Sequence, residues 1–104
     1  MENNTTEKIT FYVGLKTKDG FDINGADALK DVSGVMADVT DGFNVIEGVG
    51  YWKGQAEYCL IVSFLNLSGA SDSLITKASD DIRVKLNQDA VLVERYPVSF
   101  RMVG

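Results

Sequence analysis

Two aromatic residues and a lysine follow one another in the stretch VGYWKGQAEY, residues 49–58. Tyr51, Trp52 and Lys53 lie between glycines, where the chain is expected to turn and where packing rarely needs large rings. An indole or phenol ring can stack on a planar ligand, and a lysine ammonium can bind its phosphate or carboxylate. These three residues are therefore candidates for binding an anionic molecule that contains a ring, such as a nucleotide.

Aromatic residues more often serve structure than ligand binding. They close the ends of hydrophobic cores and are enriched in subunit interfaces. The sequence therefore leaves three interpretations open for Tyr51 and Trp52: core, interface or pocket.

A second candidate patch combines Arg95, Tyr96 and Arg101. The planar fork of an arginine matches the oxygen atoms of phosphate or carboxylate groups. The more ordinary interpretation is that Arg95 pairs with Glu94 or with another of the many carboxylates, because charges on strands are usually solvated or paired.

The chain contains no histidine and a single cysteine, Cys59. This composition removes the commonest routes to acid–base catalysis, to Ser or Cys triads and to zinc sites. Neighbouring carboxylates such as Asp80 and Asp81 lack the spacing of a calcium loop. Gly48, Gly50 and Gly54 do not match a phosphate-binding loop. We expect no catalytic residue, no metal, no cofactor and no enzymatic activity.

The chain has 104 residues with 15 acidic and 10 basic side chains, a net charge of −5. This length predicts one domain, and the negative charge argues against nucleic acid as a partner. Residues 1–8 are polar and are expected to form a disordered lead-in before a single domain at 9–104. We find neither an apolar signal segment nor a membrane span, so a cytoplasmic location is expected.

Apolar residues recur at every second position in some stretches and at every third or fourth position in others. The first pattern predicts strands and the second predicts helices. Residues after Pro97, 98–103, alternate again and could add a short fifth strand. The expected elements are strands at 9–15, 43–50, 57–65 and 90–96, and helices that open at Asn24 and Ser71.

The order βαββαβ predicts an α+β fold of the ferredoxin-like type. Its four-stranded antiparallel sheet would have the spatial order 4-1-3-2, with two helices on one face. In this topology the end of the first strand, the hairpin and the turn before the fourth strand share one edge. The candidate ligand-binding residues at that edge are Lys16, Lys18, Tyr51, Trp52, Lys53, Asn87 and Gln88.

The helices cover only one face of such a sheet, and both alternating residue sets of 58–64 are apolar. An uncovered apolar face of this size is rare in monomers. We therefore expect a homo-oligomer, most simply a dimer.

Three stretches give the chain a resemblance to known proteins: FYVGL at 11–15, GYWKG at 50–54 and NQDAVLVERYPVSF at 87–100. In these stretches it resembles an uncharacterised family of small bacterial and phage proteins. The resemblance carries over no functional residue. It implies a phage origin, the host cytoplasm as location and an anti-defence role that blocks or sequesters a host component.

Two functional hypotheses remain. In the first, the chain is a non-enzymatic oligomeric module that captures a small anionic, nucleotide-like signalling molecule. In the second, it is a protein–protein inhibitor or assembly module whose acidic surface binds a basic partner.

Overall fold

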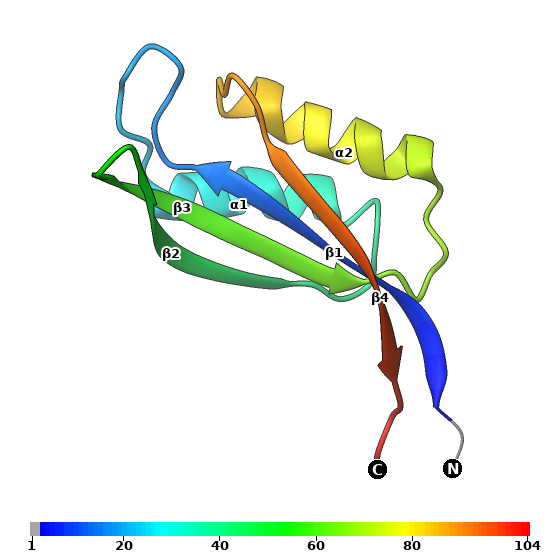
Figure 1. The fold of residues 1–104 in the computed structure, drawn as a ribbon. Coiled ribbons are helices and arrows are strands. Elements are labelled where there is room, and N and C mark those ends of the chain that lie inside the picture. Colours follow the sequence, from blue (N-terminus) through cyan, green and yellow to red (C-terminus); the bar gives the residue numbers. More distant parts are fainter. Residues whose placement is uncertain (1–2) are drawn as a thin grey trace.

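The computed structural model describes residues 3–104, so Met1 and Glu2 of the expected lead-in lie outside the described residues. Neither helix in this range has the length and apolar character that a membrane crossing requires. The elements, in chain order, are β1 (Asn4–Gly14), α1 (Gly25–Met36), β2 (Asn44–Trp52), β3 (Gln55–Leu65), α2 (Asp72–Lys85) and β4 (Leu92–Phe100) (Figure 1).

The strands form one antiparallel sheet in the spatial order β2-β3-β1-β4, and both helices lie on the same face of it (Figure 1). This confirms the predicted ferredoxin-like arrangement, because the order is the expected one read from the opposite edge. The two central strands, β1 and β3, are each bonded on both sides. The sheet therefore has two free edges, β2 and β4.

The hydrophobic core lies between the sheet and the helices. One cross-strand row shows its construction: Val45, Val62, Phe11 and Val93 are register partners on successive strands. The rings of Phe11 and Phe64 meet edge to face, with centroids 6.1 Å apart at 75°. The apolar stripes of the helices complete the core with Ala28, Val32, Met36, Ile75, Ala78 and Ile82.

Each helix begins at the predicted cap. The Asn24 side chain accepts hydrogen bonds from the backbone of Ala26 and Asp27, and the Ser71 hydroxyl accepts one from Leu74. The first helix, α1, ends at Met36. A tight turn follows, which buries Val39 against the core.

The β2–β3 hairpin turns on two residues, Lys53 and Gly54. Both have positive φ angles, 49° and 78°, as the two central residues of a type I′ turn require. Tyr51 and Trp52 are therefore the last residues of β2 rather than loop residues, and Trp52 is the register partner of Gln55.

The expected disordered lead-in is wrong for the described residues from Asn4 onward. Residues Asn4 to Lys8 belong to β1 and pair with β4 over the range Tyr96 to Phe100. The stretch is too polar to read as a buried strand, but backbone pairing with β4 does not depend on side-chain hydrophobicity.

The expected fifth strand is also absent among the described residues. Pro97 does not interrupt β4, because it remains in register with Glu7. A proline is tolerated in an edge strand, where half of the N–H groups face away from the sheet. Beyond the end of β3, β1 and β4 continue as a two-stranded arm that projects from the body (Figure 1).

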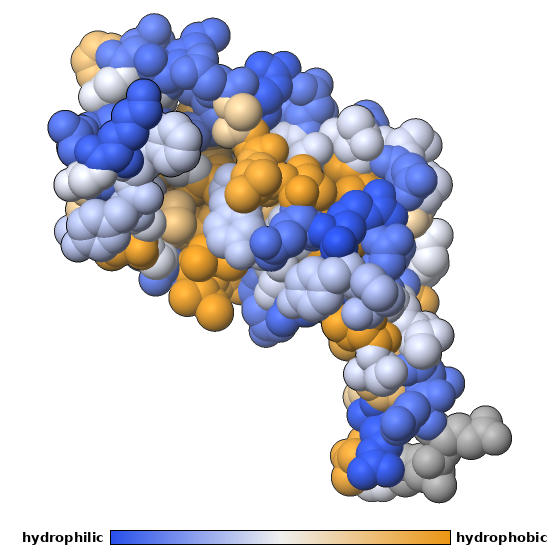
Figure 2. Space-filling view, viewed as in Figure 1, coloured by the Kyte–Doolittle hydropathy of each residue, from blue (hydrophilic) through white to orange (hydrophobic). Residues whose placement is uncertain are grey.

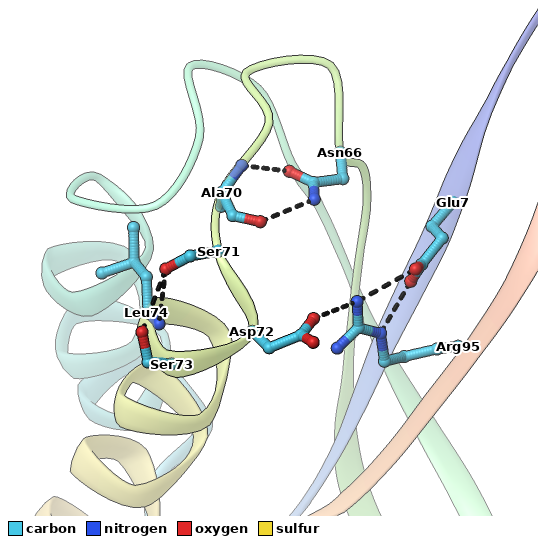
Figure 3. A network of polar contacts seen from close by, with 8 residues as sticks. All are labelled: Glu7, Asn66, Ala70, Ser71, Asp72, Ser73, Leu74 and Arg95. Carbon is cyan, nitrogen blue, oxygen red and sulfur yellow. Dashed lines mark hydrogen bonds and ion pairs between the residues drawn. The ribbon is translucent and has the colours of Figure 1, made fainter.

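Arg95 joins this arm to the helical layer (Figure 3). Its guanidinium donates to both carboxylate oxygens of Glu7, at 2.6 and 3.0 Å, and lies 2.8 Å from Asp72 at the start of α2. Hydrogen bonds to these two carboxylates raise the pKa of Arg95. The neighbouring loop is closed by the Asn66 side chain, which bonds both backbone groups of Ala70.

The sheet face opposite the helices is not covered by any described residue of this chain. Its central cross-strand row consists of Ile46, Ile61, Tyr12 and Leu92, and we call this surface the open face. Ile46 is 60% exposed and Leu92 is 64% exposed. Figure 2 shows hydrophobic side chains gathered over the centre of this side of the molecule.

Candidate functional site

A cavity of about 360 Å³ lies where the end of β1, the start of β3 and the turn after α2 meet. This is the edge at which the topology predicted a ligand site. We call it the edge cavity. Its lining residues are Gly14, Leu15, Lys16, Asp22, Gln55, Ala56, Glu57, Tyr58 and Gln88.

The loop after β1 forms one wall of the edge cavity and is held by its own backbone. Lys16 and Asp22 pair as an isolated antiparallel bridge, and the N–H of Ile23 donates to the carbonyl of Leu15 at 2.9 Å. The N–H of Lys18 donates to the carbonyl of Asn87 at 2.8 Å. This wall is therefore fixed before any ligand arrives.

The turn after α2 forms the floor of the edge cavity. Asn87 has a φ of 50°, a left-handed conformation that asparagine tolerates better than most residues. Its side-chain amide donates to Asp19 at 3.0 Å. The next residue, Gln88, is buried, and its amide donates to the carbonyls of Lys16 and Leu86. Both residues thus attach the turn to its surroundings.

Two carboxylates and a tyrosine complete the lining. The ion pairs between described residues involve neither Asp22 nor Glu57, so both carboxylates remain available to a ligand. Tyr58 is exposed beside them. With Lys16, the charged groups of the lining are one cation and two anions. The edge cavity is therefore more acidic than the predicted site.

The sequence-predicted set is brought together only in part. Lys16 and Gln88 line the edge cavity, and Lys18 and Asn87 belong to its frame. Sequence reasoning missed Asp22, Gln55, Glu57 and Tyr58. The alternation of β3 could have placed Glu57 and Tyr58 beside the end of β1, but nothing in their types distinguished them from other strand residues.

The aromatic pair that motivated the predicted site lies outside the lining. Tyr51 and Trp52 are 76% and 66% exposed, on opposite faces of β2 near the hairpin tip. The Lys53 ammonium lies 5.8 Å from the Trp52 ring centroid, within cation–π range. The interpretation that these rings close the end of the core is wrong for the described chain.

The second predicted patch does not converge. Arg95 pairs with carboxylates, as charged residues on strands usually do. Its partners are Glu7 and Asp72 and not its neighbour Glu94. Tyr96 points to the other face of β4, and Arg101 follows the end of that strand. Glu94 accepts a hydrogen bond from the Tyr12 hydroxyl at 3.1 Å, which raises the pKa of Tyr12.

No family model and no curated protein match this sequence. Solved structures do match its fold. A phage SAM lyase in complex with S-methyl-5′-thioadenosine is similar with a TM-score of 0.62 and 19% identity, over 93% of this chain and 90% of that chain. These values show a shared fold.

Two bacterial proteins are also similar. CPII, a nitrogen regulatory PII-like protein from Thiomonas intermedia K12 bound to ADP, AMP and bicarbonate, has a TM-score of 0.61 and 7% identity, over 98% of this chain and 99% of that chain. A DUF3240 family protein from Shewanella baltica OS155 has a TM-score of 0.46 and 10% identity, over 95% and 94% of the two chains. The phage SAM lyase and CPII thus share this small ferredoxin-like fold.

The similarity to the phage SAM lyase corrects one expectation. We expected no enzyme because the sequence has no histidine and no catalytic motif. The lyase is an enzyme, and the structural match covers nearly the whole of both chains. The absence of a familiar motif therefore does not exclude catalysis on this fold.

Proposed function

We propose that the edge cavity binds a small molecule that contains adenosine. Its volume of about 360 Å³ lies within the range of about 300–1,000 Å³ typical of small-molecule sites. The ligands of the two most similar proteins described above, S-methyl-5′-thioadenosine and the nucleotides ADP and AMP, share the adenosine group. The Tyr58 ring offers a surface on which an adenine base can stack.

The reaction that we propose at this site is the cleavage of S-adenosylmethionine. The bond between sulfur and the γ carbon of the methionine part breaks, and both electrons stay on sulfur. The leaving group is then neutral S-methyl-5′-thioadenosine, which no acid needs to protonate. A chain without histidine can therefore support this reaction.

The γ carbon must form a new bond as the sulfur leaves. In one route the carboxylate oxygen of the same substrate attacks the γ carbon; in the other, a β proton passes to a carboxylate of the protein and the electrons of the broken C–H bond form a double bond between the β and γ carbons. The first route yields a lactone and the second an unsaturated amino acid. The NMR spectrum of the co-product distinguishes the two.

The single observation that carries this proposal is the acidic character of the edge cavity. S-adenosylmethionine brings a sulfonium and an ammonium group, and Asp22 and Glu57 are carboxylates without ion-pair partners among the described residues. Lys16 is placed to meet the single carboxylate of this substrate. A polyphosphate would instead meet two negative charges for each positive one.

Titration calorimetry with S-methyl-5′-thioadenosine tests the binding proposal. The variant Tyr58→Ala should weaken binding about 5- to 150-fold, because stacking on an aromatic ring contributes about 1–3 kcal/mol per base. Tyr51→Ala is a matched control, since Tyr51 lies on the neighbouring strand but outside the cavity lining. Equal losses in both variants, or none in either, would count against this site.

A second candidate function is the capture of a small anionic, nucleotide-like molecule, the ligand class that the sequence suggested, with an adenine nucleotide as the specific candidate. It is favoured by Lys16 in the lining and by the ADP and AMP bound to CPII. The same titration separates the two candidates. Tighter binding of AMP or ADP than of S-methyl-5′-thioadenosine, without turnover of S-adenosylmethionine, would favour capture.

We also propose that the chain assembles with copies of itself through the open face. Ile46 and Leu92 are exposed at the two ends of the row, with Ile61 and Tyr12 half-buried between them, and monomers rarely expose a large apolar patch. A dimer is the simplest assembly that covers it. Light scattering at micromolar concentration should give at least twice the 11.3 kDa mass of one chain, and a monomer mass would contradict this.

A further inference from the structure

The side-chain amide of Gln88 donates two hydrogen bonds, both to backbone carbonyls. Its Nε2 donates to the carbonyl of Lys16 at 2.9 Å and to the carbonyl of Leu86 at 3.0 Å. Both N–H groups are therefore used by the protein. The side chain is only 7% exposed, so its conformation is determined by the fold.

The other half of this amide has no protein partner. Within residues 3–104, no hydrogen bond engages Oε1 of Gln88, and no fully enclosed side-chain nitrogen or oxygen lacks a partner. Oε1 must therefore reach open space, and the space that Gln88 borders is the edge cavity. A buried side chain thus presents one fixed acceptor to the proposed ligand site.

This acceptor cannot become a donor by rotation of the amide. A flip would place Oε1 against the carbonyl oxygens of Lys16 and Leu86, and two hydrogen bonds would be lost. The position therefore selects a ligand group that donates, and it opposes one that accepts.

We infer that Oε1 of Gln88 accepts a hydrogen bond from the 6-amino group of adenine, and that the site thereby rejects purines with a 6-oxo group. This inference rests on the proposed adenosine site. When a glutamine pairs with adenine in nucleic-acid recognition, its oxygen accepts from this same 6-amino group and its N–H donates to the ring. Only the first of these two bonds is open to Gln88, because both of its N–H groups are bound to the protein. Ribose hydroxyls and the ammonium group have better acceptors in the charged carboxylates of Asp22 and Glu57. The neutral acceptor Oε1 of Gln88 therefore remains for the neutral 6-amino group of adenine.

The test compares two ligands that differ only at this position: S-methyl-5′-thioadenosine and S-methyl-5′-thioinosine. The wild-type protein should bind the 6-amino compound about 5- to 150-fold more tightly in calorimetry, because an unpaired buried acceptor costs about 1–3 kcal/mol. The variant Gln88→Leu should bind both with similar affinity. Asn44→Leu, which removes an exposed amide of β2 outside the cavity lining, should keep the wild-type preference.

Gly14→Ala provides a second variant in case Gln88→Leu does not fold. A Cβ at Gly14 would stand 2.9 Å from Oε1 of Gln88, so it displaces the acceptor while Gln88 itself remains. This variant should also lose most of the preference for the 6-amino compound.

The outcomes separate the inference from the proposed function. If the wild-type protein binds both compounds equally, the role of Gln88 is wrong and the adenosine site stands. A folded Gln88→Leu or Gly14→Ala variant with the full preference also overturns that role. If neither compound binds to the wild-type protein, the proposed function fails and the inference fails with it.

Discussion

Oε1 of Gln88 lies so close to Gly14 that a Cβ atom added to this glycine would stand 2.9 Å from it. Real Cβ atoms essentially never approach another atom so closely. The glycine at the end of β1 thus leaves room for the Gln88 side chain, which donates to the carbonyl of Lys16. This contact joins two segments 72 residues apart in the sequence.

The first prediction concerns this close contact. Gly14→Ala should lower the free energy of unfolding by about 1–3 kcal/mol, because the added methyl group forces the buried amide of Gln88 to move. Gly34→Ala is the control. A Cβ at Gly34 would meet nothing within 4 Å, and alanine in a helix should raise stability by about 0.5–1 kcal/mol. An unchanged free energy of unfolding for Gly14→Ala in denaturant titration would contradict this prediction.

Trp52→Ala should change the melting temperature little. Burial of a tryptophan in the core would make this substitution cost about 3–5 kcal/mol, but the Trp52 side chain is 66% exposed. The lost contact is the one with Lys53, which is worth about 0.5–1 kcal/mol at an exposed site. A sharp fall of the melting temperature would show that another copy of the chain buries the ring.

Leu92→Lys should dissociate the assembly formed through the open face. A lysine at this position would place a charge at the β4 end of the apolar row, which a partner copy packed on the row cannot solvate. Val84→Lys is the matched control, because Val84 is also exposed, at 62%, but lies on α2. Light scattering should give a lower mass for Leu92→Lys alone. Equal masses for both variants would exclude the open face as the interface.

Tyr12 gives a prediction for high pH. Its hydrogen bond to Glu94 raises the pKa of the phenol above the ordinary 10.0. A raised pKa means that the folded state favours the protonated phenol. The contribution is therefore fully present below the ordinary pKa and is lost as the pH rises through the folded-state value. The stability difference between the wild-type protein and Tyr12→Phe should thus stay constant at neutral pH and shrink above about pH 10.

The fold could be predicted because its elements follow local rules. Asn24 and Ser71 cap the helices as their side chains allow, and the period-2 pattern of β1 identifies its buried face. The same local rules do not predict where the strands end. Whether residues 4–8 pair with β4 depends on a partner some 90 residues away, and Pro97 stops a strand only in the middle of a sheet.

The candidate site could be predicted as a place but not as a set of side chains. Topology brings the end of β1, the hairpin and the turn before β4 to one edge, which is where the edge cavity lies. Which side chains face it depends on register. The type I′ turn at Lys53 and Gly54 pairs Trp52 with Gln55, and the lining then includes Gln55, Glu57 and Tyr58 of β3 but not Trp52. The turn type and the strand register decide which residues line the cavity, and no short motif in this chain specifies them.

The most direct measurement is the conversion of S-adenosylmethionine by the purified protein, followed by chromatography of S-methyl-5′-thioadenosine. Each chain should convert many molecules of S-adenosylmethionine. Glu57→Gln should reduce the rate about tenfold or more, since the substrate cation loses a charged partner in the edge cavity. Asp80→Asn should leave the rate unchanged, because Asp80 lies on α2 outside the edge cavity. A wild-type rate no higher than the protein-free background would contradict the proposed lyase activity.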